Sequence, residues 1–368
     1  MTLPRGAWRE FLQAATRPSR YALLTIVLLN VIFLSAILLL VTPSRMATSL
    51  PAYLAGSGTF DEHVTGAALR LAGEKPGQTL VVTLGASAIR EALDASDLEE
   101  ALKKRMTKKR GIKKVTAYNL ATGRQSLYDS IALAEKIPIG SAGVVLLSMG
   151  PSRLTRPPSE LEQATLAPRL GFRSDAVEAL ARARGIDIPP RFGVYPIDNM
   201  RFLAPRLTTL AYRLVIAGPQ PRRAHMYLQR PPQRGKQWLR TGRKIAKRFQ
   251  EYGTNAAHNF DLVNQLVALI RGRTKMTVAL IDHPANPRFL REFAPEGFIE
   301  RHRRLVTEAA NHLKTPYLSL NELADLEESE FYDWCHLRDP IAIQRCADAI
   351  AEKIAPLLTG ISARERPR

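Results

Sequence analysis

Residues 78–93 read QTLVVTLGASAIREAL and carry the strongest fold signal in the chain. The first part is a short apolar, β-branched run that ends at Gly85, a pattern typical of a strand buried on both faces of a parallel sheet. After a tight turn, Ser87 stands at the start of a predicted helix. Backbone N–H groups at a helix N-terminus favour negative charge, so Ser87 is either a hydroxyl nucleophile or a plain N-cap serine.

Strand and helix patterns alternate along the rest of the chain. Further strands are predicted at 115–119, 142–149, 276–284 and 315–320. Helical patterns occur at 97–106, 126–137, 259–273 and 340–358. Strands that alternate with helices predict an α/β fold, in which helices cover both faces of a parallel sheet. The proline-rich residues 155–255 interrupt this alternation, and we interpret them as an insertion over the functional edge of the sheet.

A second chemical motif, DWCHL at 333–337, precedes the last predicted helix. A spacing of three lets one short turn present both a carboxylate and an imidazole, so that Asp333 can hold one ring nitrogen of His336 while the other faces a serine. The order along the chain favours this pairing, because Ser87 follows the first strand and the Asp–His pair comes at the end of the same sheet. The sequence therefore predicts a catalytic triad of Ser87, His336 and Asp333.

Four blocks of the sequence resemble the SGNH, or GDSL-like, hydrolase family. They read GASAIREAL, YNLATGRQSL, VVLLSMGPSRL and DWCHLRDPIAIQRCADAIAEKI, and together they bracket residues 78–358. The resemblance implies an SGNH-like, flavodoxin-like parallel sheet between helices. It also implies that Ser87 is the nucleophile, His336 the general base and then acid, and Asp333 the carboxylate that orients His336. It implies no cofactor.

The family resemblance also implies an oxyanion hole, formed by the serine N–H, a glycine N–H and an asparagine side chain. The second block offers Gly123, although its glycines are shifted relative to the family pattern. The third block has no asparagine and reads GPSR at 150–153. Because the loss of one such donor costs about 10²–10³ in rate, we expect Ser152 or Arg153 to substitute, unless the site differs or activity is low.

A few other residues are weighed as site candidates. Asn119 is a further candidate for the site, but the favoured interpretation is that its side chain caps a turn. His283, in IDHPANPRF, is interpreted as structural rather than catalytic. The remaining histidines show no ligand spacing, so no metal site is predicted. Cys335 and Cys346 are either a disulfide or, the favoured interpretation, two buried thiols.

Residues 21–41, YALLTIVLLNVIFLSAILLLV, are 21 residues without a charge. A helix of that length spans a hydrocarbon core of roughly 30 Å. Four arginines and one acid precede it, so the positive-inside rule places the N-terminus in the cytoplasm. An uncleaved anchor is favoured over a signal peptide, because the apolar run is long. The predicted organisation is a cytoplasmic tail (1–20), a single transmembrane anchor in the cytoplasmic membrane (21–41), a stalk (42–76), a periplasmic or extracytoplasmic SGNH-like domain (77–358) and a basic tail (359–368).

The chain of 368 residues carries 53 Lys and Arg against 34 Asp and Glu, a net charge of +19. Its 45% hydrophobic content excludes a disordered tail. A domain outside the cytoplasm does not meet DNA or cytosolic RNA, so no nucleic-acid partner is expected. The positive charge instead predicts binding to anionic lipid and envelope polymers. Basic runs at 103–114 and 230–248 are either solvated faces or polymer-binding surfaces, with Trp238 and Tyr252 available to stack on sugar rings.

The predicted architecture is also similar to accessory proteins of polysaccharide O-acetylation and of D-alanine transfer. That similarity implies a membrane-bound O-acyltransferase as partner. We therefore predict a serine O-acyltransferase or acylesterase that acts on a cell-envelope or exported polysaccharide. The alternative is a non-catalytic SGNH-like scaffold that binds anionic polymer and recruits the membrane-bound partner.

Overall fold

The structure is a computed structural model that describes residues 19–56, 60–75, 78–106, 115–220, 225–250 and 252–364. The side chains of residues 34, 37, 38 and 359–364 lie outside this description. The same holds for three predicted features: the cytoplasmic tail up to residue 18, residues 107–114 of the first basic run, and the end of the basic tail.

Five parallel strands form a sheet in the order β2-β1-β3-β4-β5. Their bounds are β1 (Thr79–Leu84), β2 (Val115–Asn119), β3 (Ala142–Ser148), β4 (Lys275–Ile281) and β5 (Tyr317–Leu318). In register, Val81 of β1 pairs with Ala117 of β2 on one side and with Val144 of β3 on the other. This is the flavodoxin-like strand order, and it confirms the predicted α/β fold with a parallel sheet. The strand order reverses direction between β1 and β3, where such sheets bind ligands at their carboxyl ends.

Successive residues of β1 point to opposite faces of the sheet. Leu80 and Val82 belong to one hydrophobic cluster and Val81 to another. The first cluster is covered by α5 (Asp61–Ala72), α8 (Leu127–Ala134), α16 (Ala256–Arg273) and α18 (Phe298–Leu313). The second is covered by α7 (Ala95–Met106), α19 (Leu320–Ala324) and α20 (Pro340–Arg364). Burial on both faces explains the continuous apolar runs of the strands.

The predicted insertion lies between β3 and β4 and consists mostly of short helices. They are α9 (Pro151–Leu154), α10 (Glu160–Leu166), α11 (Asp175–Ala183), α12 (Tyr195–Asp198), α13 (Met200–Leu203), η1 (Ala204–Arg206), α14 (Leu207–Tyr212), η2 (Arg213–Ala217) and α15 (Gly235–Gln250). The prolines lie between these elements or at their starts, since all nine elements carry Pro only at their first positions or not at all. Two further short elements, α17 (Pro287–Phe293) and η3 (Glu328–Glu330), lie after β4.

The predicted stalk differs most from the structure. Its described residues form α3 (Pro43–Ala47), α4 (Pro51–Leu54) and α5, which pack into the folded domain. Met46, Leu50 and Leu54 are buried with Phe202 and Leu210 of the insertion. Small residues suggested a linker, but Gly66 of α5 allows close packing, because a Cβ there would lie 2.8 Å from the carbonyl oxygen of Met46.

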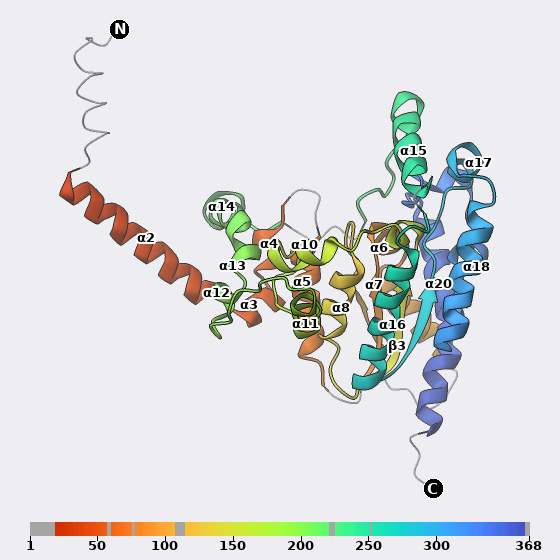
Figure 1. Cartoon of the computed structure of the whole chain (residues 1–368), viewed down its shortest axis with the longest axis horizontal. Coiled ribbons are helices and arrows are strands. Elements are labelled where there is room, and N and C mark those ends of the chain that lie inside the picture. Colours follow the sequence, from red (N-terminus) through yellow and green to blue (C-terminus); the bar gives the residue numbers. More distant parts are fainter. Residues whose placement is uncertain are drawn as a thin grey trace.

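The helix α2 (Arg20–Leu40) extends away from the α/β domain (Figure 1). Its described side chains are largely exposed, Leu24 at 68% and Val27 at 59%. Within the residues that the structure describes, no helix meets the combined length and apolarity of a membrane span.

Both cysteines are buried free thiols. The structure therefore has no disulfide between Cys335 and Cys346, which was the less favoured of the two alternatives.

Candidate active site

Ser87 lies at the carboxyl end of the sheet, beside the point where the strand order reverses. β1 ends three residues before it, and Ser87 is the first residue of α6 (Ser87–Ala92). Gly85 makes this turn possible, because a Cβ there would lie 2.4 Å from Cγ2 of Ile89 and 2.6 Å from Cβ of Ser148. The local sequence thus presents a half-buried hydroxyl at the usual ligand edge of the fold.

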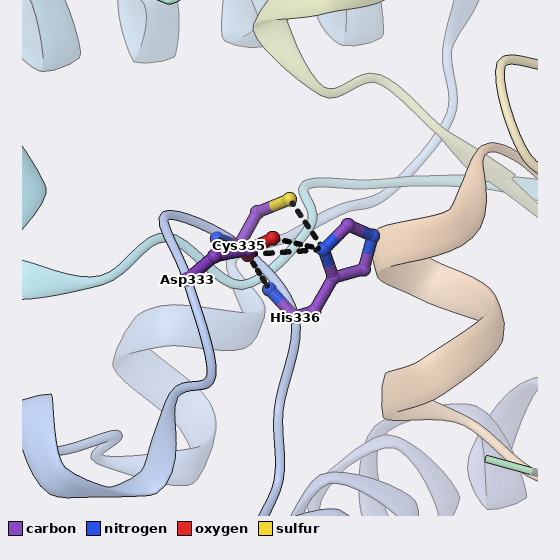
Figure 2. Close-up of side chains that lie close together, drawn as sticks. All are labelled: Asp333, Cys335 and His336. Atoms are coloured by element: carbon purple, nitrogen blue, oxygen red, sulfur yellow. Dashed lines mark hydrogen bonds and ion pairs between the residues drawn. The ribbon is translucent and has the colours of Figure 1, made fainter. Parts of the chain in front are cut away.

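Asp333 and His336 lie on a tight turn before α20. Oδ1 of Asp333 accepts hydrogen bonds from the backbone N–H groups of Cys335 and His336, both at 3.0 Å. The N–H of Tyr332 donates to the carbonyl of His336 at 2.8 Å and closes the turn. As a result, the carboxylate of Asp333 faces the ring of His336 (Figure 2).

The structure brings the three predicted catalytic residues together. Nδ1 of His336 lies 2.8 Å from Oδ2 and 3.0 Å from Oδ1 of Asp333. On the other side of the ring, Nε2 lies 2.8 Å from Oγ of Ser87. A carboxylate can only accept, so we assign the ring proton to Nδ1, which leaves Nε2 to accept from the serine hydroxyl. This is the geometry in which a histidine removes a proton from a serine.

The protonation of Asp333 suits this arrangement. Burial by itself would raise the pKa of Asp333, but the His336 ring and the N–H groups of the turn outweigh burial and lower the pKa below its ordinary value. The carboxylate therefore stays ionised at neutral pH. An ionised, buried carboxylate on Nδ1 stabilises the imidazolium that forms when His336 takes the serine proton.

Cys335 forms a cluster with the Asp–His pair, and potential ligand atoms of the three lie within 4.8 Å of one another. Its Sγ is 3.8 Å from Nδ1 of His336 (Figure 2). Burial, reinforced by the charges of Asp333 and Glu91, raises the pKa of the thiol well above its ordinary value. A metal would require a thiolate and a free imidazole lone pair, so this donor set fits a triad better than a metal site.

Two backbone donors belong to residues that line the cavity beside the triad. Gly123 and Ser87 both line the same cavity. Among the described residues, the N–H groups of Ser87 and Gly123 have no acceptor. Open space adjoins Gly123, since a Cβ built there would meet no atom within 4 Å. The structure therefore leaves both donors available to the oxygen of a substrate carbonyl.

The expected substitution of the missing asparagine is not found. Arg153 is 1% exposed and donates to the carbonyls of Ser148 at 2.8 Å and Ser126 at 3.0 Å, and to Oγ of Ser130. The prediction that Arg153 completes the oxyanion hole is therefore wrong, because its guanidinium is used in the core. Ser152 is half-buried and is not among the residues that line the cavity.

The cavity beside Ser87 and His336 has a volume of about 670 Å³. Tyr227 and Met226, from the insertion, form part of its wall. The N–H of Met226 donates to Oε2 of Glu91 at 2.8 Å, which fixes the segment against α6. A cavity of this size can hold a substrate several times larger than an acetyl group.

Tyr227 is a site residue that the sequence analysis missed. Its ring stacks on that of His336, with centroids 4.4 Å apart and planes at 28°. It also stacks on Tyr332, with a centroid separation of 4.7 Å. Burial, followed by the charges of Asp333 and Glu91, raises the pKa of Tyr227 to about 12, so the phenol is neutral at physiological pH. No local pattern in residues 225–234 indicates that one of them covers the histidine.

Replacing Tyr227 with alanine is expected to lower kcat for ester hydrolysis about 10-fold, because an aromatic face stabilises a neighbouring cation, here the imidazolium. Tyr227→Phe keeps the stack and should retain kcat within about 2-fold. The measurement is steady-state kinetics, with the exposed Tyr212→Ala as the matched control. Equal losses in the alanine and phenylalanine variants would contradict a role for the stacked ring.

Asn119 has a structural role. Its Nδ2 donates to the carbonyls of Leu93 and, at 3.3 Å, Arg90, while Oδ1 accepts from the N–H of Ala121 at 3.0 Å. These bonds tie the end of β2 to α6, in agreement with the turn-capping interpretation. A second residue missed from sequence, Asn286, donates from Nδ2 to the carbonyl of Asp333 at 3.0 Å and thereby holds the triad turn.

His283 is buried behind the triad. Its Nδ1 lies 2.7 Å from the carbonyl oxygen of Pro284, and its Nε2 has no partner among the described residues. Gly150 packs directly against the ring, because a Cβ there would lie 1.8 Å from Cδ2 of His283. Burial lowers the pKa of His283 to about 4. A neutral, tightly packed imidazole fits the structural interpretation of this residue.

This burial predicts acid sensitivity. Between pH 6.5 and 4 the unfolded chain binds a proton at His283 that the folded protein does not bind, so the free energy of unfolding falls as the pH falls. The expected contribution is about 1.4 kcal/mol per pH unit within that window. The free energy of unfolding, measured with urea at several pH values, should depend less steeply on pH in His283→Leu than in the wild type. The control His312→Leu, at an exposed histidine, should keep the pH dependence of the wild type. An unchanged slope in His283→Leu would contradict the prediction.

The two aromatic residues proposed for sugar stacking are not available for it. Trp238 is 3% exposed and donates from Nε1 to Oε2 of Glu292 at 2.7 Å. Tyr252 is 8% exposed, and its hydroxyl lies 2.6 Å from Nδ1 of His302. That prediction is wrong, because both rings belong to the core. The basic residues of α15 are exposed on the opposite side of the helix from Trp238.

No protein-family model and no curated protein sequence matches this chain. Solved structures that match it include a lipase/acylhydrolase from Enterococcus faecalis, with 13% identity, 76% of this chain and 97% of that chain covered, and a TM-score of 0.32. An extracellular lipase from Streptomyces rimosus matches with 10% identity, 75% and 99% coverage, and a TM-score of 0.36. A carbohydrate acetylesterase from Sinorhizobium meliloti matches with 10% identity, 76% and 100% coverage, and a TM-score of 0.32.

Proposed function

We propose that the protein is a serine acyl-transfer enzyme of the esterase or O-acyltransferase type. The observation that carries this proposal is the hydrogen-bonded chain from Oγ of Ser87 through Nε2 and Nδ1 of His336 to Asp333, at 2.8 Å on each side of the ring. A serine, an imidazole and a buried carboxylate in this order form an activated nucleophile.

In the proposed reaction, Oγ of Ser87 attacks the carbonyl carbon of an ester while Nε2 of His336 takes the hydroxyl proton. The N–H groups of Ser87 and Gly123 bind the resulting oxyanion. The intermediate collapses, the proton passes from Nε2 to the leaving alkoxide, and an acyl-serine remains. A sugar hydroxyl or water then gives its proton to Nε2 and attacks the acyl carbon. When the bond to Oγ breaks, Nε2 returns this proton to Oγ and Ser87 is regenerated. The acceptor decides between transferase and esterase activity.

The proposed location is the outer side of the cytoplasmic membrane, with α2 as a single anchor and the N-terminus in the cytoplasm. The uncharged sequence of residues 21–41 and the exposed apolar side chains of α2 support this proposal. A further apolar surface supports it, because Leu214, Val215 and Ile216 of η2 are exposed at 47%, 81% and 73%. η2 contacts α4, which follows α2 closely in the chain.

The proposed acceptor is a cell-envelope or exported polysaccharide, and the proposed partner is a membrane-bound O-acyltransferase that supplies the acyl group. The polar cavity supports a sugar acceptor, since arginine, aspartate and glutamate side chains line much of it. The exposed basic face of α15 supports an anionic polymer.

The test uses the full chain, purified in detergent, with p-nitrophenyl acetate as acyl donor. Release of p-nitrophenol, and acetate found on an added oligosaccharide, would support the two halves of the proposal. Hydrolysis without transfer would restrict it to an esterase. A folded protein that releases no p-nitrophenol at any pH from 6 to 9 would contradict it.

One observation favours a second function, a non-catalytic scaffold. The third block lacks the asparagine donor, and Arg153 is occupied in the core, so no side-chain donor replaces it from that block. A scaffold would bind anionic polymer as tightly in the Ser87→Ala variant as in the wild type and would show no ester turnover in either.

A further inference from the structure

Four arginines line the cavity beside Ser87, and three of them are neutralised there. Arg156 pairs with Glu160 at 2.6 Å, and Arg169 pairs with Asp61 at 2.7 Å. The third, Arg90, is 3% exposed, pairs with its neighbour Glu91 and lies over the ring of Phe60. The charges of these three arginines are balanced by carboxylates of the protein itself.

Arg124 is the exception among the four. It lines the cavity that holds Ser87 and His336, its side chain is exposed, and no carboxylate or other acceptor contacts its guanidinium in the described part of the chain. A full positive charge is therefore available at the opening of the site. An exposed arginine elsewhere on the surface would face solvent, but this one faces the same cavity as the triad.

The backbone holds Arg124 in an unusual conformation. Its φ is +58°, in the left-handed region that bulky residues seldom adopt and that costs of order 1 kcal/mol. The preceding Gly123 supplies an oxyanion donor, and Nη2 of Arg156 donates to the carbonyl of Arg124 at 3.4 Å. The turn that brings Gly123 to the wall of the cavity thus also sets where the Arg124 side chain begins.

We infer that Arg124 binds an anionic group, a carboxylate or a phosphate, on the substrate whose ester or hydroxyl lies at Ser87. The inference deepens the proposed function and rests on it. A guanidinium presents a fixed fork of donors that matches the oxygens of carboxylate and phosphate. The other three arginines of the cavity are already paired with carboxylates, so Arg124 carries the uncompensated positive charge that an anionic group can bind. The substrate class is accordingly an acidic glycan or a phosphate-bearing polymer rather than a neutral one.

The test compares the full-length wild type in detergent with Arg124→Gln and Arg124→Lys, using Arg304→Gln on α18, an exposed arginine outside the cavity, as matched control. Three acetylated substrates separate the chemistries: oligogalacturonate with carboxylates, poly(glycerol phosphate) with phosphates, and neutral xylo-oligosaccharide. Acetate release gives kcat/KM for each, and p-nitrophenyl acetate reports the basal activity. Binding of the unacetylated oligomers by calorimetry gives a readout independent of turnover.

For Arg124→Gln we expect a loss of about 10- to 100-fold in kcat/KM for one of the anionic substrates, and a similar loss in binding, the size of a charged hydrogen bond. Activity on the neutral substrate and on p-nitrophenyl acetate should be unchanged. Arg124→Lys should recover part of the loss, because it keeps the charge without the fork. Added salt should weaken the preference of the wild type for the anion.

The outcomes separate the inference from the proposed function. Turnover of p-nitrophenyl acetate with no effect of Arg124→Gln on any anionic substrate would overturn the inference and leave the function standing. Equal losses on neutral and anionic substrates would also overturn it. Anion binding that depends on Arg124 in a protein without ester turnover would overturn the proposed function and leave Arg124 as an anion-binding residue.

Discussion

Replacing Ser87 with alanine is expected to lower kcat for ester hydrolysis by about 10⁴- to 10⁶-fold, because the acyl-serine can no longer form. The residual rate would come from the oxyanion donors and from substrate binding. The removed hydroxyl is half-buried and its partner is Nε2 of His336, so the fold should keep its melting temperature. Steady-state kinetics on p-nitrophenyl acetate, together with thermal unfolding, measures both effects.

Ser152→Ala provides the matched control for this variant. Ser152 also lies at the start of a short helix after a strand, but it does not line the cavity. We expect its kcat to equal that of the wild type. If Ser87→Ala kept more than a tenth of the wild-type rate, Ser87 would not be the nucleophile.

Asp333→Asn is expected to lower kcat by about 10⁴-fold with little change in KM. An amide at this position can donate to Nδ1 of His336, which would favour the tautomer with the proton on Nε2. That tautomer cannot accept the proton of Ser87. Burial alone would raise the pKa of Asp333, but the His336 ring and the N–H groups of the turn lower it below its ordinary value. The carboxylate of the wild type should therefore stay charged in mildly acidic solution.

The control for Asp333→Asn is Asp187→Asn, which alters an exposed aspartate in the insertion. Its kinetics should match those of the wild type. Substrate binding by Asp333→Asn separates the alternatives, because a tautomer effect changes kcat alone. A raised KM with an unchanged kcat would contradict the assigned role.

The strands were predictable because each one is a short apolar run with its own boundary signals. The predicted strand at 115–119 matches β2 residue for residue, and the first predicted strand contains β1. The positions of Ser87 and of the Asp333–His336 turn were predictable for a related reason. Parallel strands place their carboxyl ends at one edge, so motifs that follow such strands come together.

The failures involve properties that depend on tertiary packing. The residues that follow α2 have the small side chains of a linker, yet these same side chains let α3, α4 and α5 pack closely. Arg153 is expected at the site because it lies in the third block, where the family pattern has an asparagine, whereas in the structure three acceptors hold it in the core. Trp238 is buried because the apolar side of α15 packs against the core. The spacing of the basic residues in α15 does not show on which side of the helix Trp238 lies.

Tyr227 and Asn286 show a second limit. Each contacts the triad from a segment distant in sequence. Tyr227 belongs to no recognised motif, and the segment IDHPANPRF, which contains Asn286, gives no sign that this side chain holds the Asp333 turn. Only the fold shows that Tyr227 covers the ring of His336. Positioning residues of this kind are found from the structure, whereas the nucleophile and its base are found from the sequence.

The central claim is that His336 activates Ser87, and the most direct test is intact-mass spectrometry of the full chain after treatment with a fluorophosphonate. This reagent phosphonylates serines that a neighbouring base has activated. The account predicts one adduct on the wild type and none on Ser87→Ala or His336→Ala. A folded wild type without an adduct, or an adduct that persists in Ser87→Ala, would contradict it.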